Sequence, residues 1–268
     1  FTVIFGLRKL DPTERHKGMM VIVAIESLVK LFAIIIIGFF VVFFVMDGIG
    51  DVLNQAQEQN LFKSLATEHG GSGYANWISV MILSMFAVMF LPRQFHVSVV
   101  ENTSEKHIST VMWVLPLYLF LITFFTIPIA MSGGLLNPDS SVIDFYVLTI
   151  PIEQNAAFIS MIAFIGGFSA STSMIMITSM TMAIMISNYL LLPLLELYKP
   201  LGFLKKRILI LRWCIVSVFI FMGYLFYLLV SKDNLIVNIG LISFTAILQF
   251  APVIIGGLFW KEANRNGA

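Results

Sequence analysis

The sequence predicts an all-α membrane protein with about six transmembrane helices. Apolar residues make up 59% of the 268 residues and charged residues only 12%, against roughly 25% charged in an ordinary soluble domain. So few charges cannot cover a surface that faces water, whereas a surface that faces lipid needs none. Two further observations support this class: long apolar runs follow one another along the chain, and Lys and Arg gather in alternate connecting segments.

Each predicted span is an apolar run long enough to cross the hydrocarbon core, which is about 30 Å thick and takes roughly 20 residues of helix. Five runs reach this length, at about 18–46, 110–135, 155–192, 207–230 and 234–259. A sixth run, about 75–91, is shorter and runs into the sequence LPRQ at 91–94. Proline at that place indicates a broken helix.

The run 155–192 is longer than one crossing requires. A helix longer than the hydrocarbon core is accommodated by tilting or bending. We therefore expect this run to tilt, to kink near Gly166-Gly167, or to leave the membrane before Pro193.

The distribution of basic residues orients the six spans. Thirteen of the sixteen Lys and Arg lie on one side, which comprises the segments 1–17, 92–109, 193–206 and 260–268 with the adjoining Arg207 and Arg212. The opposite segments, 47–74, 136–154 and 231–233, hold only Lys63 and Lys232, and Lys30 lies inside the first span. Cytoplasmic loops are enriched in Lys and Arg, so we expect both ends of the chain in the cytoplasm.

One outer loop has the pattern of a surface helix. Within 51–66, the residues Leu53, Ala56, Leu61 and Leu65 fall near one face of a helix. We expect an amphipathic helix that lies on the membrane surface.

Several classes of function are excluded by residue counts and motifs. The 16 basic and 15 acidic residues nearly balance, whereas a nucleic-acid partner requires a concentrated basic face. The single Cys214 excludes a disulfide framework and a Cys-based metal site. The sequence holds no HExxH, GxSxG or phosphate-binding loop, so we expect this segment to have no catalytic residues and no cofactor.

Ionisable and polar residues inside the spans are the first candidates for function, because they are costly in lipid. Glu26 and Lys30 are one helical turn apart, so one can neutralise the other; they form either a structural ion pair or a pair with a role in coupling or gating. Gln94 and His96 follow the break at Pro92. They either line a solute pathway at a broken helix or mark the cytoplasmic face of the membrane.

A run of small and hydroxyl-bearing residues, GGFSASTS at 166–173, is the most informative stretch. Hydroxyl and carbonyl oxygens suit a hard monovalent cation better than a transition metal, and a kink at the glycines would free carbonyls to join them. The alternative is that small residues and hydroxyls let helices pack closely and hydrogen-bond across the interface. The residue types alone leave both interpretations open.

Four stretches resemble a known family. The ninth helix of the sodium:solute symporter family is similar to AFIGGFSASTSMIMITSMTMAIMISN at 163–188, and its eleventh helix with the following loop to GGLFWKEANRNGA at 256–268. The symporter-like domain at the N-terminus of bacterial sensor histidine kinases is closer still. It resembles FGLRKLDPTERHKGMMVIVAIESLVKL at 5–31 and LPRQFHVSVVEN at 91–102.

The resemblance implies a five-plus-five inverted-repeat core of the LeuT type. Residues 18–46 would be the last helix of the first repeat and 75–259 the second repeat, so that 1–268 is a partial symporter-like domain. The chain begins at Phe1 and ends at Ala268 soon after an apolar run, and we expect an internal piece of a longer protein whose earlier helices are missing. Alone, it should not transport.

The resemblance also implies an ion site. In the family a Ser-Thr pair on the ninth helix ligates the coupling sodium ion, and here the pair matches Ser171 and Thr172, with the backbone carbonyl of Phe168 one turn earlier. Many symporters read Gln-Pro-His at the broken helix, where this chain reads Gln94-Phe95-His96.

The function expected from these features is symport of a small polar solute, such as an amino acid, coupled to Na⁺ by alternating access. The protein would lie in the bacterial inner membrane, surrounded by lipid, as the transmembrane domain of a larger sensor kinase. The alternative is a sensory module that passes solute or ion occupancy to a fused histidine kinase with little or no transport.

Overall fold

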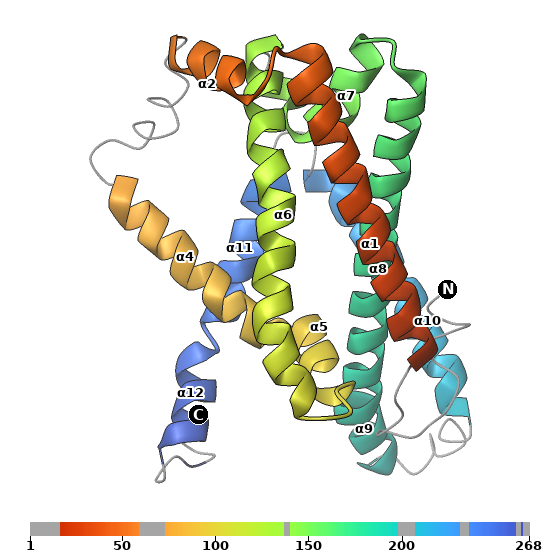
Figure 1. The fold of residues 1–268 in the computed structure, drawn as a ribbon. Helices are drawn as coiled ribbons and strands as arrows, with labels where there is room; N and C mark the ends of the chain where they lie inside the picture. Colours follow the sequence, from red (N-terminus) through yellow and green to blue (C-terminus); the bar gives the residue numbers. More distant parts are fainter. Residues whose placement is uncertain are drawn as a thin grey trace. The chain divides into compact units, whose positions relative to one another are not determined.

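The computed structural model describes residues 17–58, 73–136, 140–197, 207–230, 236–260 and 264. Within these ranges every regular element is a helix and no strand occurs, which confirms the all-α class (Figure 1). In the described part of the chain, five helices are long and apolar enough to cross a membrane: Gly18–Val45, Lys106–Leu136, Ala157–Leu197, Ile208–Leu229 and Asn238–Phe259. A sixth candidate span is the pair Trp77–Phe90 and Pro92–Val100, which are bent by 50° at Leu91.

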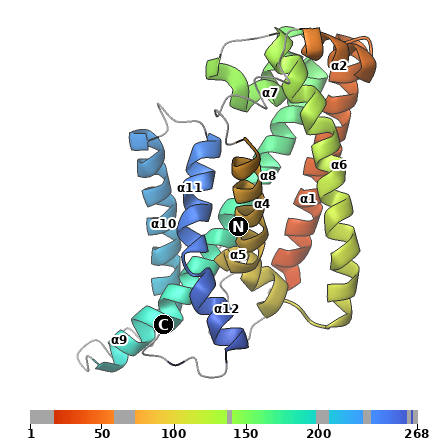
Figure 2. The same cartoon turned by 90° about the vertical axis from the view of Figure 1, so that its left-hand side faces the viewer.

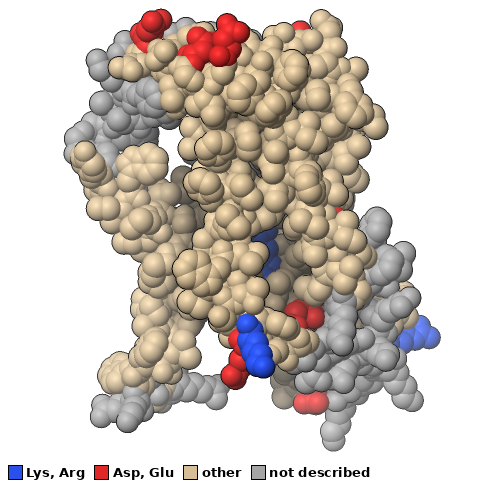
Figure 3. Space-filling view, in the orientation of Figure 1, with Lys and Arg blue, Asp and Glu red and all other residues tan. Residues whose placement is uncertain are grey.

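The surfaces of these helices suit lipid. Trp113, Phe120 and Phe221 are more than half exposed, as are many other large apolar side chains of the spans. In Figure 3 the surface over α1 (Lys17–Phe40) and α6 (Lys106–Leu136) is almost free of charge, and acidic side chains gather at the end where α2 (Ile49–Glu58) lies. The described part of the chain is therefore a set of helices suited to a membrane.

The chain divides into two units, of which the first comprises His16–Gly73 and Asn102–Met176. We call it the α1–α6–α8 unit. Its elements are α1 with the π-helix η2 (Val41–Val45), α2, α6, the 3₁₀-helix η4 (Ser140–Phe145), α7 (Tyr146–Glu153) and α8 (Ala157–Ile186) as far as Met176. Figures 1 and 2 show α1 and α6 side by side. Its core joins α1, η2, α6, α7 and α8 through Ala33, Ile37, Val41, Ile129, Tyr146, Ile150 and Ala163.

The outer-loop helix α2 confirms part of the amphipathic prediction. Val52 and Ala56 are buried and α2 contacts α6, whereas Leu53 is exposed. The buried face therefore includes Ala56 but is centred on Val52 rather than on Leu53. Leu61 and Leu65 lie outside the described residues.

The second unit comprises Phe1–Arg15, Tyr74–Glu101 and Ile177–Ala268, and we call it the α4–α10 unit. Its described elements are α4 (Gly73–Phe90), α5 (Pro92–Phe95), the π-helix η3 (His96–Val100), the rest of α8, the π-helix η5 (Ser187–Leu191), α9 (Leu192–Leu197), α10 (Ile208–Val230), α11 (Ile236–Leu248) and α12 (Ala251–Phe259). The LeuT-type repeat stays a prediction.

One sequence prediction about the α4–α10 unit needs correction. The segment after Pro92 is helical as far as Val100, so the connection to α6 is shorter than the predicted loop 92–109. Leu91 has an extended backbone (ψ 122°), and Pro92 then begins a new helix, because proline lacks the N–H that an interior position needs but fits the first turn. The long run 155–192 is also followed by further helix, since α9 continues to Leu197 after the π-helix η5, and the place where it leaves the membrane stays a prediction.

At Gly166-Gly167 α8 is a continuous α-helix, so the helix is not broken at the place where one of the three alternatives expected a kink. Gly166 instead lets α1 approach: a methyl group at its Cα would collide with Cβ of Ala33. The glycine serves helix packing, as small residues commonly do in membranes.

Candidate functional site

The candidate site lies where α8 crosses α1 within the α1–α6–α8 unit. Because Gly166 allows close approach, the hydroxyl residues that follow it reach the backbone and side chain of Glu26. Ser169 Oγ donates a hydrogen bond to the backbone carbonyl of Glu26 at 3.1 Å. Thr172 Oγ1 lies 3.4 Å from the carboxylate oxygen Oε1 of Glu26 and donates toward it. The two helices are thus joined by polar contacts at one turn of each.

The contact leaves the carboxylate incompletely satisfied. Thr172 Oγ1 also lies 2.9 Å from the carbonyl oxygen of Phe168 and 3.1 Å from that of Ser169, and its single proton serves one acceptor at a time. The other carboxylate oxygen, Oε2 of Glu26, is buried and has no hydrogen-bond donor among the described residues. A buried charged oxygen without a partner is costly, so this oxygen is a point at which a cation would be stabilised.

Glu26 and Lys30 form no ion pair within the described part of the chain, which removes the structural ion pair of the two predicted alternatives. The carboxylate of Glu26 is turned to Thr172 on α8, whereas Nζ of Lys30 lies 5.8 Å from the ring centroid of Tyr118 on α6. Tyr118 in turn donates from its hydroxyl to the carbonyl of Ser27 at 3.3 Å. The spacing of one turn places the two charges on adjacent parts of α1, but partners on different helices draw them apart.

The three groups predicted to ligate sodium are brought together only in part. Thr172 Oγ1 and the carbonyl of Phe168 are in contact, but Ser171 Oγ donates to the carbonyl of Gly167 at 3.0 Å and its side chain is exposed. Because α8 stays helical, these carbonyls remain within the helix. Ser171 and Thr172 therefore face different neighbours, and the oxygen that Thr172 meets across the crossing belongs to Glu26, to which the sequence had assigned another role.

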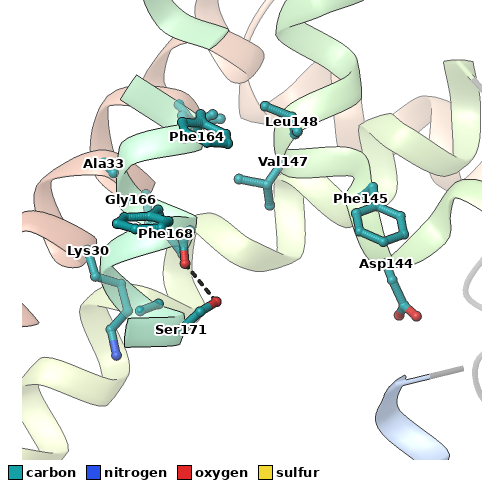
Figure 4. Close-up of a pocket in the computed structure, with 15 residues that line it drawn as sticks. Lys30, Ala33, Asp144, Phe145, Val147, Leu148, Phe164, Gly166, Phe168 and Ser171 are labelled. Atoms are coloured by element: carbon teal, nitrogen blue, oxygen red, sulfur yellow. Dashed lines mark hydrogen bonds between the residues drawn. The ribbon is translucent and has the colours of Figure 1, made fainter. Parts of the chain in front are cut away.

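Ser171 faces a cavity of about 500 Å³ in the same unit. Figure 4 shows Lys30, Phe168 and Ser171 on one side of this cavity and Phe145 and Asp144 on the other. The cavity is lined by α1, by the junction of η4 and α7, and by α8. The cation-suited oxygens and the cavity are thus built on neighbouring turns of α8.

The predicted residues Gln94 and His96 lie in the α4–α10 unit, after the bend at Leu91. His96 is buried, at 7% exposure, and its Nε2 lies 3.4 Å from Oε1 of Glu101, which is also buried. Gln94 is half-buried, and its backbone carbonyl accepts a hydrogen bond from Ser98 at 2.7 Å. His96 is therefore a buried member of a His–Glu pair. Glu101 was missed because it follows His96 by five positions. Residues five positions apart come together on a π-helix but not on an α-helix.

A second buried charge in this unit, Arg212 on α10, was also missed. It is 3% exposed, and its guanidinium donates to Ser187 Oγ at 2.8 Å and to Asn188 Oδ1 at 2.9 Å, both on η5. The sequence placed Arg212 with the basic residues at the membrane face. Its position five residues into a long apolar run is the signal that could have singled it out.

No protein-family model, curated protein sequence or solved structure matches this chain. The described residues also hold no group of three or more His, Cys, Asp or Glu side chains placed to bind a metal ion. The functional interpretation therefore depends on the geometry at α1 and α8.

Proposed function

We propose that the protein is the membrane domain of a sodium-coupled symporter for a small polar solute, working by alternating access. The observation that carries the proposal is the contact of Thr172 with Glu26 across the α1–α8 crossing, beside a buried carboxylate oxygen that has no donor among the described residues. Sodium is a hard cation that accepts carboxylate, hydroxyl and carbonyl oxygens, and these three kinds of oxygen occur at this crossing.

The proposed ion site uses Glu26, Thr172 and the carbonyl of Phe168, with Ser171 at its edge. A cation there neutralises a charge that the membrane otherwise penalises. It also bridges two helices, so that the ion stabilises one arrangement of α1 and α8 over others. Such a preference is what couples ion binding to a change of access.

The bacterial inner membrane and a fused histidine kinase remain part of the proposal through the resemblance of residues 5–31 and 91–102. Residues 5–16 of the first stretch lie outside the described residues. The second stretch contains α5 and η3, with the His96–Glu101 pair. A sensory module without transport is the second candidate, and extending the reading frame beyond Ala268 distinguishes a kinase core from further membrane spans.

The ion site is tested by ²²Na⁺ binding to the purified chain in lipid nanodiscs, measured in choline chloride. Glu26→Gln and Thr172→Val each remove one oxygen ligand with little change of volume. We expect either change to raise the half-saturating sodium concentration about tenfold or more, since a contact to a charged group contributes about 1.5–3 kcal/mol. Ser171→Ala should have a smaller effect.

Ser243→Ala is the matched control. Ser243 donates to the carbonyl of Ile239 within α11, as Ser171 does to Gly167 within α8, and it is exposed. Its loss should leave sodium binding unchanged. Sodium binding that is equally strong in wild type, Glu26→Gln and Thr172→Val would overturn the proposed site.

A further inference from the structure

The cavity beside Ser171 has walls that select a ligand with an apolar body. Its volume is about 500 Å³, within the range of about 300–1,000 Å³ that is usual for small-molecule sites. Most of its lining is aliphatic, aromatic or glycine. These residues are Ala33, Ile34, Ile37, Phe145, Val147, Leu148, Ala163, Phe164, Gly166, Gly167, Phe168 and Ala170.

Two of the aromatic rings give one wall a defined shape. Phe164 and Phe168 are one turn apart on α8, and their rings stack with centroids 6.2 Å apart and planes 17° apart. Both rings are 62% exposed, so they present area that a ligand can cover. Figure 4 shows Val147 and Leu148 across the cavity from this wall.

Lys30 gives the cavity a cationic group. It is the only Lys or Arg among the lining residues, and it lies within the span Gly18–Val45. Among the described residues no carboxylate pairs with it, and its contact is with the ring of Tyr118. A cation–π contact of about 0.5–2 kcal/mol does not replace the counter-ion that a cation inside a membrane requires.

Asp144 lies on the opposite side of the cavity from Lys30 (Figure 4). Charge complementarity therefore favours a ligand with one anionic group near Lys30, and the apolar lining disfavours a second charge in the same ligand.

We infer that this cavity binds an apolar-bodied monocarboxylate, with its carboxylate at Lys30 and its apolar body against Phe164, Phe168 and Val147. The inference rests on the proposed symport in that it names the class of solute. Two sources share this chemistry, namely a simple monocarboxylate and an apolar amino acid. An amino acid adds an ammonium group to the carboxylate, and the test distinguishes the two.

The test is a ligand series on the purified chain in phosphatidylcholine nanodiscs, in choline chloride without sodium. The probe is [¹⁴C]phenylacetate, and its competitors are the neutral 2-phenylacetamide, the cationic phenethylamine, the dianionic phenylmalonate and the zwitterionic L-phenylalanine. We expect phenylacetate to bind about tenfold or more tightly than the amide and the amine, because neither offers an anionic group to Lys30. It should also bind more tightly than the dianion, whose second carboxylate would lie against the apolar lining. Tighter binding of L-phenylalanine than of phenylacetate identifies an amino acid as the source, and the reverse order identifies a simple monocarboxylate.

Variants locate the site. Lys30→Gln should weaken phenylacetate binding about tenfold or more, and Lys30→Arg should retain it. Lys106→Gln, at an exposed position where α6 begins, is the control and should bind as wild type does. Equal affinity for phenylacetate and its amide in wild type overturns the inference, as does loss of phenylacetate binding when phosphatidylglycerol is added, which would assign Lys30 to a lipid headgroup.

Because the series contains no sodium, it does not depend on the ion site. If phenylacetate does not bind as expected but Glu26→Gln still weakens ²²Na⁺ binding, the inference about the solute is wrong and the proposed ion site stands. The opposite result can also be distinguished. If carboxylate binding depends on Lys30 but Glu26→Gln leaves sodium binding unchanged, the proposed ion site is wrong and the carboxylate site stands.

Discussion

The close approach of α1 and α8 at Gly166 can be tested with its neighbour as control. A methyl group at Gly166 would collide with Cβ of Ala33, whereas one at Gly167 meets nothing within 4 Å. Overpacking a tight interface costs about 1–3 kcal/mol. Both glycines lie within α8, so the gain in helix propensity when Gly becomes Ala is the same for both and cancels. We therefore expect Gly166→Ala to be less stable than Gly167→Ala by about 1–3 kcal/mol.

The assay is reversible unfolding in mixed micelles of dodecyl maltoside and SDS, followed by tryptophan fluorescence. A second substitution gives the reasoning a sharper form. Ala33→Gly removes the colliding Cβ, after which the nearest atom is Cα of Ala33 at 3.9 Å, an ordinary contact. Gly166→Ala combined with Ala33→Gly should recover about 1–2 kcal/mol relative to the sum of the single changes.

The ion site gives this interface a second readout. Gly166→Ala should also weaken ²²Na⁺ binding, because it separates Thr172 from Glu26, and the Ala33→Gly background should restore it. Equal stability of the two glycine variants, or a double variant whose losses simply add, would refute the close approach as the basis of the site.

Three further predictions concern the α4–α10 unit. Arg212→Ala should lower the free energy of unfolding by about 2–4 kcal/mol in the same assay, because it removes two charged hydrogen bonds. The control Arg207→Ala, at an exposed position, should lower it by less than about 0.5 kcal/mol. Equal losses would contradict the buried contact. His96→Gln and Glu101→Gln should show a coupling of about 1–3 kcal/mol in a double-mutant cycle, and strict additivity would speak against the pair. Cys214 is exposed on the apolar helix α10. A charged maleimide should label it in SDS but not in nanodiscs, because hydrocarbon excludes both the reagent and the thiolate. Rapid labelling in nanodiscs would place α10 in water.

The spans were predictable because lipid imposes length and composition on each helix separately. The helix break at Pro92 could be predicted equally well, because a missing backbone N–H affects only the neighbouring turn of helix. The contact between Glu26 and Thr172 could not be predicted from local sequence. Spacing along α1 pointed to Lys30, whereas Thr172 lies 146 residues further along the chain and reaches Glu26 only because Gly166 lets two helices touch. A glycine such as Gly166 permits either a kink or the close approach of another helix, so the sequence alone could not distinguish the two.

The π-helices were invisible for a related reason. His96 and Glu101 meet because η3 holds residues five apart on one face, and Ser187 and Asn188 on η5 meet Arg212. A π-turn has no residue pattern of its own and depends on the contacts that stabilise it. Polar residues at such turns were therefore assigned to the membrane face or left without a partner.

The separation of Glu26 from Lys30 has a consequence for coupling if both proposals hold. Two opposite unit charges roughly 6 Å apart would attract by about 3 kcal/mol at an effective dielectric constant near 20, and the charges of Glu26 and Lys30, which their partners draw apart, attract by less than that. A sodium ion at Glu26 cancels most of that attraction, so that Lys30 then binds a carboxylate more tightly. Thermodynamic linkage requires the carboxylate to strengthen sodium binding by the same factor. Sodium should therefore raise phenylacetate affinity on the order of tenfold, and Glu26→Gln should raise it without sodium and remove the sodium effect. A sodium effect of equal size in wild type and Glu26→Gln would show that these two charges do not couple the sites.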